Sequence, residues 1–181
     1  MTLEKKKISV SAIIVGYNES HLLKKCLESI SFCETILYVD IGSEDNSIQL
    51  VEQLGGIDIK INERVPTPEV IIAKYYKGVK NDWILVIDPD EQISDDLQKD
   101  ILSLFEGGIP NNIGNILVPW IFYYKKHLLK GTPWGGVNRK AILFNRNRCT
   151  VLPFVHKGHF PKGSYMDYNI PYTGNNKLHH Y

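Results

Sequence analysis

The residues best suited to chemistry in this chain are Asp88 and Asp90, which are separated by Pro89 and followed by Glu91. Carboxylates one residue apart can place oxygens on one hard cation, and Pro89 fixes the backbone between them. Mg²⁺ and Mn²⁺ are typically held by one or two carboxylates, while phosphates and waters complete the shell. The spacing therefore predicts a divalent metal bound together with a diphosphate. An acidic turn that caps the next helix would use the same residues, so the motif alone leaves both interpretations open.

The position of this motif favours the metal interpretation. The motif follows the apolar run 83–87, which has the composition of a strand buried on both faces. Open α/β sheets bind ligands at the edge where such strands end. Two earlier strand-like runs end at that edge, the first before Tyr17 and the second at Asp40. Tyr17 could stack on a nucleobase, and Asp40 could accept a uracil imide N–H or a ribose hydroxyl, although the segment after Asp40 is also a good helix start.

The pattern of apolar residues predicts an α/β fold with a mostly parallel sheet flanked by helices. Strands are expected at 8–15, 35–40, 57–61 and 83–87, and helices at 19–30, 45–54, 67–80 and from Ser94 to about Gly107. After Pro110 the alternation gives way to short strand-like runs at 115–118, 141–145 and 151–156, which indicate mixed or antiparallel strands. The aromatic stretch 119–137 between them is expected to be an acceptor-side loop or to close the core.

Composition limits the class of protein. The chain has 181 residues, 43% hydrophobic and 23% charged, with a formal net charge of +1. These values are typical of one soluble domain, and the charge gives no electrostatic case for nucleic acid. The one run of three basic residues is Lys5-Lys6-Lys7, which is short and terminal, and no apolar run reaches the roughly 20 residues of a membrane span. We therefore expect a cytoplasmic protein with at most peripheral membrane contact.

Several of these segments together resemble family 2 glycosyltransferases with the GT-A (Rossmann-like) fold, near the branch that includes lipopolysaccharide-core glucosyltransferases. The resemblance is carried by four segments in order, namely 13–19, 26–30, 40–47 and 83–91. It implies one GT-A domain over 1–181, with a nucleotide-sugar-binding half at 1–108. The acceptor half, 109–181, would end early because such transferases commonly continue further.

The resemblance also implies roles for single residues. Tyr17, Asn18, Glu19 and Asp40 become candidates for binding the nucleotide diphosphate sugar donor, and Asp88 and Asp90 for binding Mn²⁺ or Mg²⁺. Relatives of this kind build cell-envelope polysaccharide near the inner membrane face. The expected reaction is therefore an inverting transfer from a UDP-sugar to a saccharide or lipid-linked acceptor.

The second half matches the family more loosely. Residues 141–146 resemble the strand that carries R-L-F-R in relatives, and 154–157 occupy the place of V-H-E, with Lys157 instead of the acid. Lysine cannot serve as a carboxylate base, so Glu91, beside Asp90, becomes the first candidate base and Asp167 another. His156 is a candidate contact for the diphosphate or the metal.

Two other functions remain open. A sugar nucleotidyltransferase would need a glycine-rich phosphate loop after the first strand, and Tyr17-Asn18-Glu19-Ser20 does not provide one. A catalytically degenerate or truncated nucleotide-sugar-binding module would explain both Lys157 and an early end. His179 and His180 lack zinc-ligand spacing, so solvent or substrate contact is expected for them.

Overall fold

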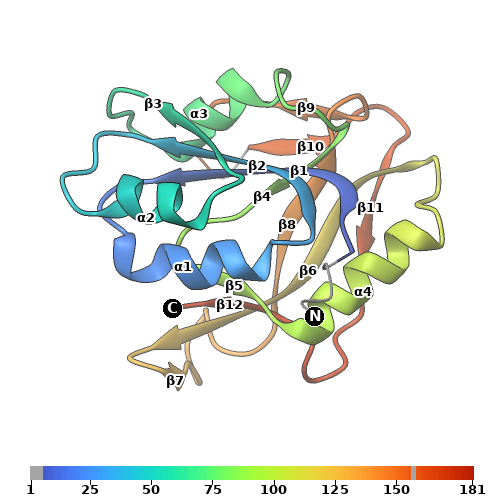
Figure 1. The fold of residues 1–181 in the computed structure, drawn as a ribbon. Helices are drawn as coiled ribbons and strands as arrows, with labels where there is room; N and C mark the ends of the chain where they lie inside the picture. Colours follow the sequence, from blue (N-terminus) through green and yellow to red (C-terminus); the bar gives the residue numbers. More distant parts are fainter. Residues whose placement is uncertain (1–5, 156–157) are drawn as a thin grey trace.

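A strongly twisted mixed sheet forms the centre of the computed structural model, which describes residues 6–155 and 158–181 (Figure 1). The first strand, β1 (Ile8–Gly16), is buried at every position except Ser9. A strand with so few exposed positions must be covered on both faces. The parallel part of the sheet has the order β3 (Asp58–Ile61), β2 (Cys33–Asp40), β1 and β4 (Trp83–Val86). The predicted α/β fold with a mostly parallel core is confirmed.

Four helices among the described residues cover this sheet, and the side chains of β1 show which helix lies on which face. Val10, Ala12 and Ile14 share a core with α1 (Ser20–Ser29), α2 (Ser47–Leu54) and α4 (Asp95–Glu106). Ile13 and Val15 pack instead with α3 (Pro68–Tyr75) on the opposite face. Figure 1 shows α1, α2 and α4 in front of the sheet and α3 at its far upper side. This alternation produces the continuous apolar run seen in the sequence.

The helix starts follow the predicted capping chemistry. The Ser94 hydroxyl accepts a hydrogen bond from Leu97 N at 3.3 Å, and two aspartates occupy the first turn of α4. Pro68 opens α3, where its missing N–H costs no hydrogen bond. That helix ends at Tyr75, not near Lys80, because the chain turns away before β4.

The second half extends the same sheet with both antiparallel and parallel pairings. β8 (Asn138–Asn145) runs antiparallel to both β4 and β6 (Ile113–Tyr124), so a strand from the second half lies beside one from the first. Beyond β6 follow β12 (Leu178–His180) and β5 (Glu91–Ile93), while β11 (Met166–Asn169) and β7 (His127–Leu128) also pair with β6. Strands from both halves therefore build one sheet.

Two boundaries predicted in this half are wrong. The strand expected at 115–118 extends to Tyr124, because β8 and β12 pair with it as far as Phe122 and β7 pairs with its last two residues. Trp120 and Tyr123 therefore lie on a strand and not in a loop. The strand expected at 151–156 ends at Val151 as β9 (Cys149–Val151), which pairs with β10 (His159–Pro161). Within the described residues, no helix is both long and apolar enough to cross a membrane.

Candidate active site

Three strand ends meet at one edge of the sheet, as the sequence predicts. Gly16 at the end of β1 pairs in register with Asp40 at the end of β2, and Ile13 of β1 pairs with Val86 just before the acidic turn. The loops after β1 and β2 are joined by hydrogen bonds. Asn18, whose φ is 57°, accepts from the backbone N–H groups of Glu44 (2.7 Å) and Asp45 (3.3 Å) through its side-chain oxygen. This edge is therefore a fixed arrangement of loop ends.

Asp40 lies beneath this edge. Its side chain is buried, with one oxygen accepting from Gly42 N (2.9 Å) and Ser43 N (2.8 Å), and the other from the Tyr38 hydroxyl (3.1 Å). Tyr38 leaves no room for a side chain at position 16, because a Cβ there would lie 2.5 Å from its hydroxyl. Asp40 thus orders the loop that follows it, whatever it contributes to a ligand.

The acidic turn after β4 is closed by its own hydrogen bonds. Glu91 N donates to the Asp88 carbonyl oxygen at 3.0 Å, and Asp88 N donates to Glu91 Oε2 at 3.1 Å. The Glu91 side chain has no exposed surface, whereas the side chains of Asp88 and Asp90 are 41% and 28% exposed. The turn therefore offers two aspartates to a ligand and keeps its glutamate inside.

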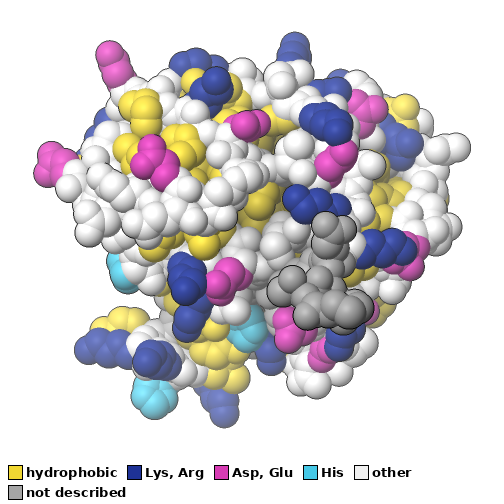
Figure 2. All heavy atoms as spheres, viewed as in Figure 1, with side chains coloured by type: hydrophobic (Ala, Val, Ile, Leu, Met, Phe, Trp, Pro, Cys, Tyr) yellow, Lys and Arg dark blue, Asp and Glu magenta, His cyan; other side chains and the backbone are white. Residues whose placement is uncertain are grey.

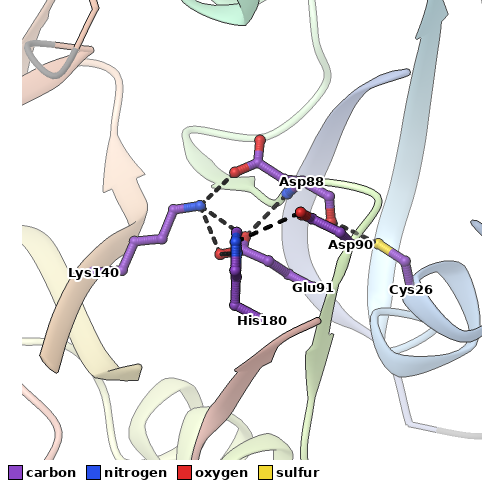
Figure 3. A network of polar contacts seen from close by, with 6 residues as sticks. All are labelled: Cys26, Asp88, Asp90, Glu91, Lys140 and His180. Carbon is purple, nitrogen blue, oxygen red and sulfur yellow. Dashed lines mark hydrogen bonds and ion pairs between the residues drawn. The ribbon is translucent and has the colours of Figure 1, made fainter. Parts of the chain in front are cut away.

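Lys140 of β8 provides the positive charge of this cluster (Figure 3). Its Nζ lies 2.6 Å from Asp88 Oδ2 and 2.8 Å from each carboxylate oxygen of Glu91. These carboxylates hold the pKa of Lys140 well above its usual range against the opposing effect of burial. Buried Glu91 is thus neutralised by a residue of the second half.

His180 of β12 also lies beside the turn (Figure 3). Its Nε2 is 3.6 Å from Asp90 Oδ2 and its Nδ1 is 3.5 Å from Glu91 Oε1, distances that are long for hydrogen bonds. The contact with Glu91 raises the pKa of His180 despite partial burial. Its ring packs against Trp120 (5.4 Å between centroids) and Phe122 (4.8 Å) of β6. The cluster therefore has an aromatic wall supplied by the second half.

Glu19 adds a further acid to this edge. Burial raises its pKa, and the negative charges of Asp90 and Asp88 raise it further, while its carboxylate accepts from Tyr17 N at 3.3 Å. Burial likewise raises the pKa of Asp90, and the neighbouring carboxylates of Asp88 and Glu91 act in the same direction. Acids that raise one another's pKa in this way favour a cation at the site.

The donor set fits a hard divalent cation that is completed by a ligand. Asp88 and Asp90 have carboxylate oxygens on an accessible surface, and carboxylate oxygen is the preferred donor of Mg²⁺ and Mn²⁺. Within residues 6–155 and 158–181, no group of three or more Asp, Glu, His or Cys side chains forms a fuller metal site. Phosphate oxygens would have to supply the remaining positions.

The structure does not bring every predicted residue to this cluster. Tyr17 lies on the same edge with the Arg64 guanidinium 3.9 Å from its ring centroid, so a cation already covers one aromatic face. Asp167, on β11, pairs opposite Asn115 at the far end of β6, away from the acidic turn. Its position opposes a role as base, because an acceptor at Asp90 would be out of its reach. His156 and Lys157 lie outside the described residues.

Lys140 was not predicted as a member of the site, and His180 was expected only to contact solvent or substrate. A lysine at the start of an apolar run has the pattern of an exposed strand end. Lys140 comes near Asp88 only because β8 lies beside β4, and His180 only because β12 pairs with β5, where His180 is opposite Glu91. The one sequence signal was the adjacency of His179 and His180.

The chain matches known proteins over most of its length. Residues 11–154 match the model of the family described as Glycosyl transferase family 2. An uncharacterized glycosyltransferase of Rickettsia felis is 31% identical over 107 residues, which are 53% of this chain and 34% of that protein. The lipopolysaccharide core biosynthesis glycosyltransferase LpsC of Rhizobium meliloti is 26% identical over 167 residues, with 87% of this chain and 59% of LpsC covered. The chain thus spans only part of the length of these relatives.

Several solved structures share the fold of this chain. TarS of S. aureus, residues 1–349, has a TM-score of 0.53 at 18% identity over 70% of this chain and 38% of that chain. The mannosyltransferase PcManGT of Pyrobaculum calidifontis, in complex with GDP-Man and Mn²⁺, has a TM-score of 0.52 at 14% identity over 61% and 35%. Glucosyl-3-phosphoglycerate synthase of Mycobacterium tuberculosis, with Mn²⁺, UDP and glucosyl-3-phosphoglycerate, has a TM-score of 0.50 at 16% identity over 64% and 44%.

Identities this low show a shared fold, here the GT-A fold, and the function class comes from the family model. That model matches the chain from Ser11 in β1 to just past β9 and includes the acidic turn and Lys140. The sheet, the strand-end carboxylates and the matched family agree, and the chain belongs to glycosyl transferase family 2.

Proposed function

We propose that this glycosyltransferase moves a sugar from a nucleotide diphosphate sugar, with a UDP-sugar as the favoured donor, to a cell-envelope saccharide or lipid-linked acceptor. The observation that carries the proposal is the pair of accessible carboxylates, Asp88 and Asp90, at the edge where β1 and β2 also end. This is the edge at which α/β sheets bind nucleotides.

During the reaction, negative charge develops on the leaving diphosphate, and the acceptor hydroxyl must lose its proton. An acceptor hydroxyl oxygen attacks the anomeric carbon, the bond from that carbon to the diphosphate breaks, and the nucleoside diphosphate leaves with the electron pair. A divalent cation bound by Asp88 and Asp90 would neutralise the leaving diphosphate. A carboxylate takes the hydroxyl proton. One direct displacement of this kind inverts the anomeric centre.

Glu91 and Asp90, the two acids that we propose for the catalytic site, have different surroundings. Glu91 has no exposed side-chain surface, and both its oxygens accept from Lys140. Asp90 is partly exposed, and burial raises its pKa, an effect that a cation bound there would oppose. We propose that Asp90 faces the substrates and that Glu91 acts as a positioning residue through Lys140. Tyr17, Asn18, Glu19 and Asp40 remain proposed donor-site residues.

The donor and acceptor are inferred from relatives. One neighbour is named as binding UDP and another as binding GDP-Man, each with Mn²⁺, so both nucleotides require testing. LpsC is named for lipopolysaccharide core biosynthesis, which supports a cell-envelope acceptor. Such an acceptor is consistent with the predicted cytoplasmic location near the inner membrane face.

Calorimetric titration with UDP and with GDP tests the donor site, first with Mn²⁺ and then with EDTA. We expect one nucleotide to bind in a metal-dependent way and Asp90→Asn to weaken that binding by more than about tenfold. Asp58→Asn is the matched control, because Asp58 is an exposed carboxylate on β3 at the opposite edge of the sheet. Equal affinity in the Asp90→Asn variant and the control would remove Asp90 from the site.

The degenerate-module alternative rests on Lys157, which occupies the place of an acid in relatives. It predicts nucleotide binding without turnover. A hydrolysis and transfer assay with the donor identified by calorimetry separates the two functions. Release of nucleoside diphosphate that is lost in Asp90→Asn supports the transferase, whereas tight binding with no release supports the module.

A further inference from the structure

The near-neutral net charge conceals an uneven distribution along the chain. Between Glu106 and Asp167 the sequence contains no aspartate or glutamate. The same segment contains Lys125, Lys126, Lys130, Arg139, Lys140, Arg146, Arg148, Lys157 and Lys162. Some of these have internal partners, since Lys140 contacts Asp88 and Glu91 and Arg146 contacts Asp82. Among the described residues, the lysines of the β6–β7 hairpin have no carboxylate partner of this kind.

The tip of that hairpin has an unfavourable backbone. Tyr124 pairs with His127, so the loop has two residues, Lys125 and Lys126, with φ of 48° and 68°. Two positive φ values in a two-residue loop define a type I′ turn, which strongly favours Asn-Gly. Lysine at such positions is strained, and strain of this kind is concentrated at functional sites. The chain thus places two cations where the turn itself would favour neither.

The lysines project beside exposed aromatic and aliphatic side chains. Tyr124 is 63%, Leu128 45% and Trp134 56% exposed, and Trp134 packs against Phe122 at 5.2 Å between ring centroids. Figure 2 shows dark blue, cyan and yellow side chains together on the lobe at the lower left, where Figure 1 places β7. In the part of the chain that the structure describes, no carboxylate pairs with Lys125, Lys126 or Lys130. We name the set Tyr124, Lys125, Lys126, Leu128, Lys130 and Trp134 the basic hairpin.

We propose that the basic hairpin is a docking surface for an anionic lipid bilayer. Exposed lysines are attracted to acidic headgroups, while tryptophan and tyrosine rings favour the interface between headgroups and acyl chains. A tip that combines both supplies apolar area and electrostatic attraction to anionic lipids, and the strength of interfacial binding depends on these two contributions. A soluble acidic glycan would use the lysines but would leave Leu128 without an apolar partner. The combination therefore favours lipid.

The position of the basic hairpin connects docking to the candidate active site. Trp120, Phe122 and Tyr124 alternate along β6, so they share one face of the strand. Trp120 and Phe122 contact His180 in the acidic cluster, and Tyr124 begins the basic hairpin. Docking would place the aromatic wall of the cluster near the bilayer. This last step rests on the proposed function, whereas the docking itself does not.

Vesicle flotation of the full chain without nucleotide tests the proposal. We expect binding to phosphatidylcholine vesicles that contain phosphatidylglycerol, no binding to phosphatidylcholine alone, and weaker binding as salt rises. Lys125→Asn/Lys126→Gly should weaken binding by at least about tenfold. That variant installs the residues that the turn prefers, so its thermal stability should equal or exceed that of the original protein. A loss of binding in this variant cannot then be attributed to misfolding.

Lys60→Glu/Lys77→Glu is the matched control, because these two exposed lysines lie on β3 and just after α3, at the far end of the sheet from β7. It should bind vesicles as the original protein does, although its charge change is larger. Tryptophan emission should shift to the blue on anionic vesicles, and Trp134→Phe should remove most of that shift.

Three outcomes would overturn the proposal. These are equal binding by the Lys125→Asn/Lys126→Gly variant, equal binding to neutral vesicles, and binding to a soluble acidic polysaccharide without binding to vesicles. None of them bears on nucleotide binding, so failure here and failure of the proposed transferase function are distinguishable.

Discussion

The two halves of the sheet contribute to the acidic cluster in different ways. In the first half, parallel strands followed by helices bring Asp40 and Asp88 to one edge through regular β/α geometry. In the second half, antiparallel pairings bring Lys140 and His180 to the same place from strands far apart in the sequence. The first half supplies the carboxylates, and the second half supplies a lysine and a histidine.

This difference shows that the site needs residues from both halves of the sheet. Glu91 is buried within the first half, and its charge is tolerated because Lys140 reaches it from β8. Four variants, in order of decreasing expected effect, test how far each half depends on the other.

Removal of Glu91 should have the largest effect. Glu91→Ala leaves Lys140, whose side chain is only 22% exposed, without two of its three carboxylate contacts. We expect the free energy of unfolding to fall by about 3 kcal/mol, at the low end for a broken buried ion pair. Urea denaturation measures this. Glu91→Gln keeps the shape and should cost less, and a loss below about 1 kcal/mol for Glu91→Ala would show that the halves are not joined here.

The contribution of His159 to the pH dependence of stability tests the second half alone. Burial lowers the pKa of His159 to about 4, and the positive charge of Lys140 acts in the same direction. The unfolded chain therefore binds more protons between pH 6.5 and about 4, and stability falls as pH falls through that window. We expect a loss of roughly 1–3 kcal/mol, measured by thermal or urea unfolding at several pH values. His159→Phe should remove this part of the pH dependence, and an unchanged profile in that variant would contradict the assignment.

Asn18 tests the first half alone. Asn18→Ala removes the acceptor for Glu44 N and Asp45 N and places alanine at a positive φ, so we expect a cost of about 1–2 kcal/mol in unfolding. Asn18→Gly loses the same acceptor but adopts that φ freely, and it should be about 1 kcal/mol more stable than the alanine variant. Identical stabilities of the two variants would show that backbone strain does not matter at this position.

Replacement of Lys140 has the smallest expected effect of the four variants, and the quantity that it changes is the affinity for Mn²⁺. Its Nζ lies 2.6 Å from Asp88 Oδ2, so Lys140→Met should strengthen Mn²⁺ binding in the absence of nucleotide by roughly three- to tenfold. Lys140→Arg keeps the positive charge and should not. Titration followed by electron paramagnetic resonance of free Mn²⁺ measures this directly. Weaker binding in Lys140→Met would show that Lys140 orders the aspartates more than it competes with the metal.

Much of the first half could be predicted from the sequence, because its structure depends on local periodicity. Buried runs, capping residues and glycine stops indicated β1, α1 and α4 to within a few residues. The course of β6 past Val118 could not be predicted, since it depends on partners contributed by β8 and β12. The net charge of the whole chain did not indicate the basic hairpin, because it averages over the acid-free segment between Glu106 and Asp167.

The sequence by itself determined the fold class, the family and the acidic turn, since all three depend on residues close together along the chain. Only the tertiary structure decided that Glu91 is buried against Lys140 while Asp90 remains accessible. It also decided that His180 lies beside the turn and that Lys125 and Lys126 form a strained tip. The physical reason is that strand pairing between distant segments sets these contacts, and pairing partners leave no local signal in the chain.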